Sequence, residues 1–518
     1  MRYTYLAYIG LAALTLAGSE AASSPSKSVD RWKDSLVTIE GTRRQYDLFQ
    51  PWSRRVRTTT KSGIVIGPRE VLTTAEDLND RTLLRFQRDG RGLWYDAELV
   101  WIDYYANLAV VSTEKAEFWS GLKPVGFLSP VPIGKEGFQL LRWRNGNLEV
   151  RKMEFNQCVV EDAKTSQAQM IQFELSSETQ GVGWGEAIIL GNKVAGMASS
   201  QNGNTCRAIP ASTIEHVLKA RREGGYRGLG FFDFVWQQAE NPDLLSHLKL
   251  EGKPRGVVVI EVPKQPVSST VMKPRDVILK VDGFEIDSDG YYRDPDYGNL
   301  NMEGLATRHR WAGDEIPIQV LRDGKTMEVR YKIPAVNYRT KILPEQLFDR
   351  EPEYLIVGGL ILQPLSIPLL RSWGDDWKRR APFRLAYYRN DDPTEERSGM
   401  VILTGMLPDP VNVGYQDMRL LVLDELNGMK IGGLQDVAKA LTMSKDGFHR
   451  MQFAKGDAIR RLVLDAKEAE SSTPQILKRY GIPKDRVIHE NSASLPPGAV
   501  PPPSAGGETA SRGGRRSR

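Results

Sequence analysis

Residues that could activate a nucleophile are scarce in this chain. Its 518 residues include five histidines and two cysteines, and the first histidine is His216. Nucleophilic catalysis by serine or cysteine needs a base within hydrogen-bond reach of the nucleophile. His216 lies in STIEHVLKARREGG, a pattern that predicts a helix capped by Ser212 and ended by Gly224. We therefore interpret His216 as an ordinary helix residue, and the sequence before it has no histidine to serve as a base.

Carboxylates offer a second route to catalysis, but their spacing does not favour it. Glu76 and Asp77 are neighbours in the run TTAEDL, and adjacent residues of a strand point to opposite faces. Paired-acid chemistry needs two carboxyl groups that face one substrate about 5–10 Å apart. Asp103 and Glu186 are other acids that would have to approach, and nothing in the sequence requires it. A replacement activity built on Glu76 is therefore disfavoured.

Two glycine-containing motifs have the composition of peptide-binding loops. In such loops consecutive backbone N–H groups hold the carboxylate of a peptide C-terminus, and the peptide adds as a strand to a sheet edge. Glycine lets the backbone approach the carboxylate closely. The motifs are GLGF, before the strand-like run FDFVW, and VGGL: Gly228, Leu229, Gly230 and Phe231, then Val357, Gly358, Gly359 and Leu360. The apolar run Ile361–Leu370 gives the second motif an alternative role, in which it fills its own groove or docks on a neighbouring subunit.

The elements that would position these residues are mostly strands. From about residue 30 to 223, runs such as SGIVIGPREVLTT, NLAVVST and NKVAGMAS are broken by glycine, proline and asparagine, which predicts a β-barrel or sandwich. Two further units, near 225–336 and 343–484, repeat a strand followed by a hydrophobic strand that ends in Asp-Gly or Asn-Gly. The polar, tyrosine-rich insert Asp287–Asn301 interrupts the first of them and would cover a groove or form a contact surface.

Composition and the two terminal segments indicate which partners and which compartment to expect. The net charge of +5 lies mostly in Arg2 and the arginines of the tail, so no basic field indicates nucleic-acid binding. Residues 1–21 are typical of a signal peptide, with an uncleaved anchor as the alternative. We expect an exported protein, periplasmic or extracellular, with no membrane span after cleavage. Residues 486–518, rich in proline, glycine and arginine, are predicted to be disordered.

The two cysteines and one aromatic loop each allow two interpretations. Cys158 and Cys206 could form a disulfide in an oxidising compartment, or stay as two buried free thiols. With so few cysteines and histidines, no metal site is predicted, and no cofactor either. The loop Tyr46–Trp52, YDLFQPW, would bury Phe49 and Trp52 on its own barrel or, as we favour, present them to another subunit.

Over roughly residues 30–485 the sequence resembles the HtrA/Deg family of serine proteases. The family histidine stands in LTNNHVV, and the matching run SGIVIGPREVLTTAEDL has Glu76 there. The aspartate of D-L-A-L-L corresponds to Asn107 in AELVWIDYYANLAVV. The serine of G-N-S-G-G-P corresponds to Gly183 in GVGWGEAII, where Trp184 and Glu186 replace the next glycine and the proline. FQPWSRR, AEFWSGLKPVGF, GGYRGLGFFDFVWQQAENPDLL and EYLIVGGLIL are most similar to the plant nucleolar-type Deg branch.

This resemblance implies a mainly β fold, with a trypsin-like double β-barrel at residues 30–223, a PDZ domain at 224–336 and a PDZ-like domain at 337–485. It also implies a homo-oligomer that binds the C-termini of peptides or proteins. Because all three catalytic positions are replaced, we expect an inactive pseudoprotease that acts in protein quality control or as an assembly scaffold in the cell envelope. Two alternatives stay open: an active serine-type endopeptidase that uses unrecognised residues, and a purely structural oligomeric scaffold.

Overall fold

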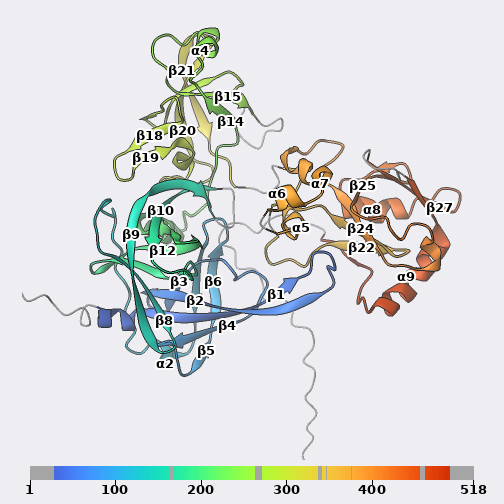
Figure 1. Cartoon of the computed structure of the whole chain (residues 1–518), viewed down its shortest axis with the longest axis horizontal. Coiled ribbons are helices and arrows are strands. Elements are labelled where there is room, and N and C mark those ends of the chain that lie inside the picture. The colour runs from blue at the N-terminus through green and yellow to red at the C-terminus, as the bar shows by residue number, and fades with distance from the viewer. Residues whose placement is uncertain are drawn as a thin grey trace, which may run out of the picture.

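The computed structural model describes residues 29–163, 168–262, 271–336, 341–345, 347–374, 376–454 and 461–489. The predicted signal peptide and nearly all of the predicted tail lie outside these residues. The described part of the chain is mainly β, as the sequence predicted, and its sheets follow one another along the chain (Figure 1). Two sheets form the trypsin-like part, and a PDZ-like sheet follows on each of the next two stretches.

The first unit is a seven-stranded antiparallel sheet in the order β5-β4-β1-β2-β3-β7-β6. Its strands are β1 (Leu36–Tyr46), β2 (Arg54–Gly67), β3 (Glu70–Thr73), β4 (Arg81–Arg88), β5 (Trp94–Asp96), β6 (Glu98–Asp103) and β7 (Leu108–Ser112). The short helices η1 (Arg31–Asp34) and α2 (Ala116–Trp119) flank it. β-Branched and aliphatic side chains from these strands fill one core, and β1 and β2 pair along their whole length as a long hairpin.

The second unit is a closed barrel in the order β10-β13-β12-β11-β8-β9. Its strands are β8 (Phe138–Arg144), β9 (Asn147–Asp162), β10 (Gln169–Ser177), β11 (Ala187–Leu190), β12 (Lys193–Asn202) and β13 (Thr205–Pro210). Helix α3 (Ala211–Arg222) follows as predicted, but its caps are Pro210 and Glu223. The predicted N-cap was wrong because Ser212 lies inside the first turn, where its hydroxyl bonds the Tyr297 hydroxyl. Gly224, at φ +71 directly after Glu223, ends the helix as predicted.

The third unit is a sheet in the order β14-β15-β16-β20-β21, with β17 on β16. Its strands are β14 (Val235–Gln238), β15 (Val257–Glu261), β16 (Val277–Val281), β17 (Phe284–Glu285), β20 (Glu315–Arg322) and β21 (Lys325–Lys332), and α4 (Pro242–His247) follows β14. The predicted insert Asp287–Asn301 holds a separate hairpin of β18 (Tyr291–Asp294) and β19 (Gly298–Asn301), continued by the 3-10 helix η2 (Met302–Ala306).

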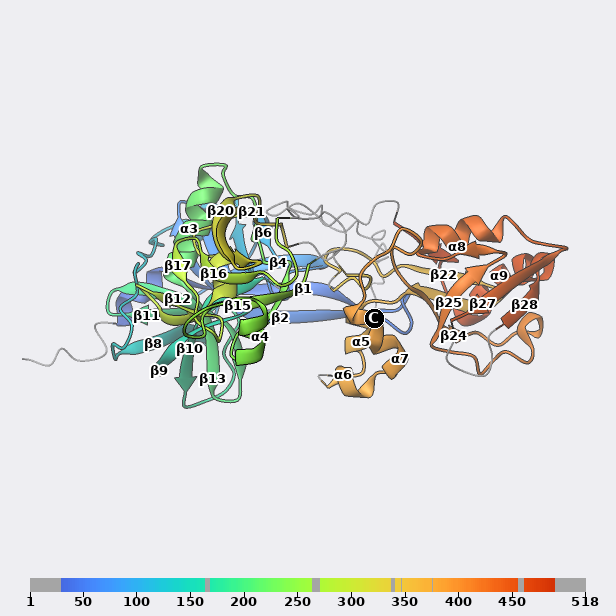
Figure 2. The same cartoon turned by 90° about the horizontal axis from the view of Figure 1, so that it is seen from above.

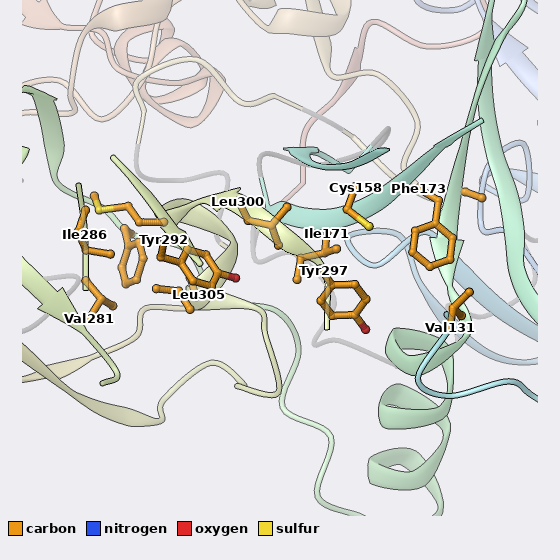
Figure 3. Close-up of a cluster of buried hydrophobic side chains, with 14 of the residues drawn as sticks. Val131, Cys158, Ile171, Phe173, Val281, Ile286, Tyr292, Tyr297, Leu300 and Leu305 are labelled. Carbon is orange, nitrogen blue, oxygen red and sulfur yellow. The ribbon is translucent and has the colours of Figure 1, made fainter. Parts of the chain in front are cut away.

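The second and third units share one hydrophobic core. Barrel residues such as Ile171 and Phe173 belong to the same buried cluster as Tyr292 and Leu300 of the hairpin and Val281 of the third sheet (Figure 3). The backbones approach so closely that a Cβ on Gly304 would lie 2.8 Å from a methyl carbon of Val160. The insert therefore buries Tyr292 and Tyr297 in this shared core, while Tyr291 stays exposed. Packing against the barrel is a role that neither of its two predicted alternatives, a cover for a groove or a contact surface for partners, included.

The fourth unit is a sheet in the order β28-β27-β25-β24-β23-β22-β29, with β26 on β25. Its strands are β22 (Tyr354–Val357), β23 (Leu360–Pro364), β24 (Val401–Met406), β25 (Leu421–Leu426), β26 (Met429–Lys430), β27 (Phe448–Phe453), β28 (Arg461–Asp465) and β29 (Arg486–Val487). Its helices are α5 (Ile367–Arg371), α6 (Trp377–Arg380), α7 (Phe383–Tyr387), η4 (Tyr388–Asn390), η5 (Pro410–Asn412), α8 (Leu434–Leu441) and α9 (Ala466–Tyr480). Because β29 pairs with β22, the predicted disordered tail begins too early.

The tip of the β1–β2 hairpin joins the first unit to the fourth. Phe49 packs edge-on against Trp373 at 5.0 Å, and Trp52 against Tyr354 at 5.7 Å. Figure 1 shows this long hairpin reaching toward α5 and β22. The aromatic loop therefore packs on the C-terminal unit of the same chain and not on its own barrel. Phe49 is still 40% exposed, and its contact with another subunit stays a prediction.

Candidate functional site

Glu76 and Asn107 are in contact in the first unit, where Glu76 follows β3 and Asn107 precedes its neighbour β7. The Glu76 backbone N–H donates to Asn107 Oδ1 at 3.0 Å, and the Glu76 carbonyl accepts from Lys61 Nζ at 2.6 Å. Asn107 is buried just before β7 at φ +53, a conformation that asparagine adopts more readily than most residues. Glu76 and Asp77 lie in a turn after β3, so their predicted strand setting was wrong. Asp77, at φ +61, forms an ion pair with Arg43 at 2.7 Å.

Gly183 lies in a turn where no side chain fits. Its φ is +110, in the region that favours glycine. A Cβ there would lie 2.9 Å from the backbone carbon of Ser200 and 3.0 Å from its Cα. The turn is held against β2, since the Ser62 N–H donates to the Trp184 carbonyl at 2.9 Å, and Thr73 Oγ1 donates to the Ser62 carbonyl at 2.7 Å. Gly183 thus lies beside the strands that lead to Glu76.

The backbone N–H groups of this turn are bonded to side chains of the same chain. The N–H groups of Gly183 and Trp184 both donate to Glu186 Oε2, at 2.9 and 2.7 Å. The N–H groups of Gly181 and the next residue donate to Gln201 Oε1, at 2.6 and 2.8 Å. In serine proteases the N–H of the nucleophile residue and that of the residue two before it bind the oxyanion. Both corresponding donors are engaged here.

Glu186 is the residue that reorganises the turn. Its side chain is 2% exposed, and Arg142 Nη1 lies 3.6 Å from its second carboxylate oxygen. Charge-assisted bonds from two amides and a nearby guanidinium offset the cost of burying this carboxylate. From sequence, Glu186 was considered as a replacement for proline and as a possible partner acid of Glu76, and not as an acceptor for backbone amides. Gln201 was missed, because it lies on β12 and carries no local signal for this contact.

His216 on α3 is half-buried against the third unit. Its ring stacks on Trp311 at 4.4 Å and meets His309 edge-on at 5.1 Å. Burial, then the neighbouring His309, lowers the pKa of His216 below its usual value. The adjoining cavity measures about 20 Å³, which is room for one water molecule and no peptide. The interpretation of His216 as a structural residue fits this packing.

Both cysteines are buried free thiols, so the disulfide alternative is not realised. Cys158 on β9 faces Phe173 on β10, and Cys206 on β13 faces Leu175 on the same strand. Strand β10 therefore separates them, and two strand spacings amount to about 9.6 Å. A disulfide requires Cα atoms within about 7 Å.

The GLGF motif lies at the start of the third unit and bonds to its own chain. Leu229 is buried in the cluster that contains Trp311, and its carbonyl accepts from the Val336 N–H at 3.0 Å. The Phe231 N–H donates to the Pro334 carbonyl at 3.3 Å. A Cβ on Gly230 would lie 2.1 Å from an Ile333 methyl carbon. Glycine is therefore needed for close approach to the chain's own strand.

The strand that follows this motif keeps one open edge. β14 pairs with β15 and is the first strand in the order of its sheet. Among the described residues no strand pairs with its other side. Val235 on β14 is 47% exposed. An edge of this kind can accept a peptide as an added strand.

The VGGL motif is the turn of a closed hairpin. Val357 and Leu360 pair directly across Gly358 and Gly359, and the Gly358 N–H donates to Thr473 Oγ1 at 2.9 Å. β23, which follows the turn, is paired with β22 on one side and β24 on the other. The run Ile361–Leu370 continues as β23 and α5, with most of its apolar side chains buried within its own unit. No edge of β23 is open to a peptide.

Two kinds of feature are absent from the described ranges. No helix there is long and apolar enough to cross a membrane. No group of three or more histidine, cysteine, aspartate or glutamate side chains is arranged there to hold a metal ion.

Comparison with known proteins gives the same family from the sequence. Residues 343–489 match the sequence profile described as a PDZ domain. Protease Do-like 2, chloroplastic, of Arabidopsis thaliana is 26% identical over 480 residues, covering 90% of this chain and 76% of the relative. Protease Do-like 4, mitochondrial, of the same plant is 25% identical over 475 residues, covering 90% of this chain and 87% of the relative.

Among solved structures, the HtrA-type protease AlgW with decapeptide is 17% identical, with a TM-score of 0.45, covering 60% of this chain and 98% of that one. The serine endoprotease from Yersinia pestis is 16% identical with a TM-score of 0.40, covering 61% of this chain and 100% of that one. On the sequence matches, the chain is a relative of the HtrA/Deg-type serine proteases that carries a PDZ domain.

Proposed function

We propose that this protein is a catalytically inactive member of the HtrA/Deg type that binds peptides or proteins. The observation that carries the proposal is the turn at Gly183. A glycine stands at the nucleophile position, and the amides that would stabilise an oxyanion donate to Glu186 and Gln201. Loss of nucleophile and base together costs on the order of a million-fold in turnover, and the remainder depends on the oxyanion donors.

The binding activity belongs to the third unit. The open edge of β14 supports peptide addition there, whereas β23 has strands on both sides. We propose that protein or peptide C-termini add to β14, and that the fourth unit serves assembly. This assignment follows the proposed division into a pseudoprotease domain at 30–223, a first PDZ domain at 224–336 and a second from 337.

The compartment and the assembly are parts of the same proposal. The signal-like residues 1–21 support export to a periplasmic or extracellular site. A homo-oligomer with a role in quality control or envelope assembly would present several β14 edges at once, which raises avidity for a multivalent partner.

Two assays on the purified full chain test inactivity. Casein digestion is expected to show no turnover, and a fluorophosphonate probe, which labels activated serines, is expected to leave the protein unlabelled. An active HtrA-type protease run beside it shows that both assays work. Stoichiometric labelling, or casein cleavage that survives repeated purification, would establish the active-peptidase alternative instead.

A further inference from the structure

Three short helices form a separate lobe between β23 and β24. α5, α6 and α7, with η4, occupy residues 367–390, which we call the helical lobe. Figure 2 shows these helices standing out to one side of the region between the trypsin-like part and the C-terminal sheet. Leu370, Trp377 and Leu385 anchor the lobe in a buried cluster that includes Ile402 of β24. The lobe is thus a folded platform with an inner face and an outer face.

The outer face of the lobe presents two aromatic rings to solvent. Phe383 is 80% exposed, more than any other large hydrophobic side chain of the described residues. Tyr387, one turn along α7, is 55% exposed, and the two ring centroids are 6.0 Å apart. Exposed aromatic pairs on a folded surface mark a site of interaction, because leaving them in water is unfavourable.

The helical lobe that carries these rings is rich in positive charge. Residues 371–389 contain six basic side chains and two acidic ones. Four of the basic residues are exposed and form no salt bridge among the described residues: Arg371, Lys378, Arg379 and Arg380. Elsewhere on the molecule arginines commonly pair with carboxylates, as Arg397 does with Asp424. The charge of the lobe is therefore available to an anionic partner.

We propose that the helical lobe docks on an anionic phospholipid surface. Phe383 and Tyr387 enter the headgroup layer, where aromatic rings are favoured, and the surrounding cations face the lipid phosphates. A twofold contact with a second copy of the lobe is disfavoured because it would set like charges against each other. Nucleic acid shares the anionic chemistry, but the proposed export carries the chain to compartments bounded by membranes.

Vesicle co-sedimentation of the full chain tests this docking. Phosphatidylcholine vesicles are compared with vesicles that also contain phosphatidylglycerol, at about 0.05 M and about 0.5 M salt. We expect roughly tenfold more protein on the anionic vesicles at low salt, and most of it released at high salt. Because the vesicles carry no peptide, the result is independent of the proposed peptide binding.

Two pairs of substitutions separate the aromatic and ionic parts. Phe383→Ser with Tyr387→Ser, and Arg379→Glu with Arg380→Glu, are each expected to abolish the preference for anionic vesicles. These side chains are exposed, so the melting temperature should stay unchanged. Matched controls on other surfaces are Val413→Ser, and Arg55→Glu with Arg57→Glu, which should bind like the native chain.

Three results would overturn the proposal. The first is equal sedimentation with both kinds of vesicle, and the second is native binding by both lobe variants. The third is the lack of vesicle binding together with either tight binding of a labelled single-stranded oligonucleotide or lobe-dependent self-association.

Discussion

At Gly183 the backbone leaves no room for a side chain. A side chain there would meet the Ser200 backbone, so the position resists the serine that catalysis needs. The neighbouring amides are engaged by Glu186 in addition. Substitution of the three catalytic residue types, without a change in the backbone of this turn, is therefore not expected to recreate a catalytic geometry.

We predict that the triple variant Glu76→His, Asn107→Asp, Gly183→Ser stays inactive toward casein and unlabelled by a fluorophosphonate. Gly183→Ala alone should lower the unfolding free energy by about 1–3 kcal/mol, because its Cβ meets backbone atoms at positive φ. Chemical denaturation measures this. Gly225→Ala, where no atom lies near the added methyl, is the control and should change stability by under about 0.5 kcal/mol. Equal effects at the two glycines would refute the steric argument.

A buried carboxylate pair makes stability depend on pH. Burial, and then the neighbouring Asp349, raises the pKa of Asp80 from 3.8 to about 7. The Asp80 N–H donates to Asp349 Oδ1 at 2.8 Å, and the Tyr104 hydroxyl donates to Asp349 Oδ2 at 2.5 Å. A raised carboxyl pKa means that the folded state holds a proton that the unfolded state releases. The pair thus joins the first sheet to the start of the fourth unit in a pH-dependent way.

The unfolding free energy should therefore fall as pH rises from 5 through 7 and level off above. Between pH 5 and 8 the loss due to Asp80 is about 3 kcal/mol. Asp80→Asn keeps the shape of the side chain and should remove this part of the slope, while Glu303, whose pKa burial also raises to about 7, keeps a smaller one. Urea denaturation between pH 5 and 8 would detect the difference. A native slope in the variant would show that Asp80 is not the titrating group.

The resemblance assigned residues to the three catalytic positions because each lies in a recognisable run, and this assignment stays a prediction. The sequence could not predict how these residues are held. Gln201 reaches the turn from another strand, and the contact of Asp80 with Asp349 joins residues far apart in the chain. Such contacts depend on how the units pack, which no local pattern encodes.

At the scale of elements, the two PDZ-like units differ in whether the strand beside the glycine motif has a free edge. β14 lies at the end of its sheet order, whereas β23 lies between β22 and β24. From sequence, the first glycine motif was expected to bind a peptide, and the second either to bind a peptide or to dock. Hairpin closure by β22 removes the second, because a strand with two neighbours has no free backbone donors or acceptors to offer.

We predict that Val235→Asp weakens binding of C-terminal peptides by roughly tenfold, because it places charge on the exposed edge strand. Fluorescence anisotropy with peptides selected from a C-terminal library would measure it. Val413→Asp, also highly exposed but outside both motifs, should bind as the native chain does. Selected peptides that bind the Val235 variant normally would place the groove elsewhere.

The sequence predicted the β-rich character and helix α3, but not the packing of the insert Asp287–Asn301. Its polarity suggested a loop that covers a groove or a contact surface for partners. In the structure Asp294 is buried beneath Arg308, and its ion pair with that arginine lets Tyr292 and Tyr297 turn inward. A charge that is neutralised locally looks the same in sequence as one that faces water.

At the scale of the whole molecule, the barrel and the third unit should unfold together. Because the two units share one core, separating them would expose the buried apolar side chains of both (Figure 3). We predict that Leu300→Ala costs about 2–4 kcal/mol and lowers one calorimetric transition that includes the barrel. Leu362→Ala, in the core of the fourth unit, should shift a different transition. A barrel transition untouched by Leu300→Ala would contradict the shared core.

Cys158 lies in the core shared by the barrel and the third unit, so the reactivity of its thiol reports how often that interface opens. Burial raises the pKa of its thiol to about 12, with Asp294 of the hairpin adding to the effect, and Cys206 is raised to about 12 within the barrel. Both thiols are therefore unreactive while the native packing holds. Alkylation of Cys158 requires the interface between the barrel and the third unit to open, and alkylation of Cys206 requires the barrel itself to open. The alkylation rates of the two native thiols would therefore distinguish local opening of the interface from unfolding of the barrel, and no engineered label is needed.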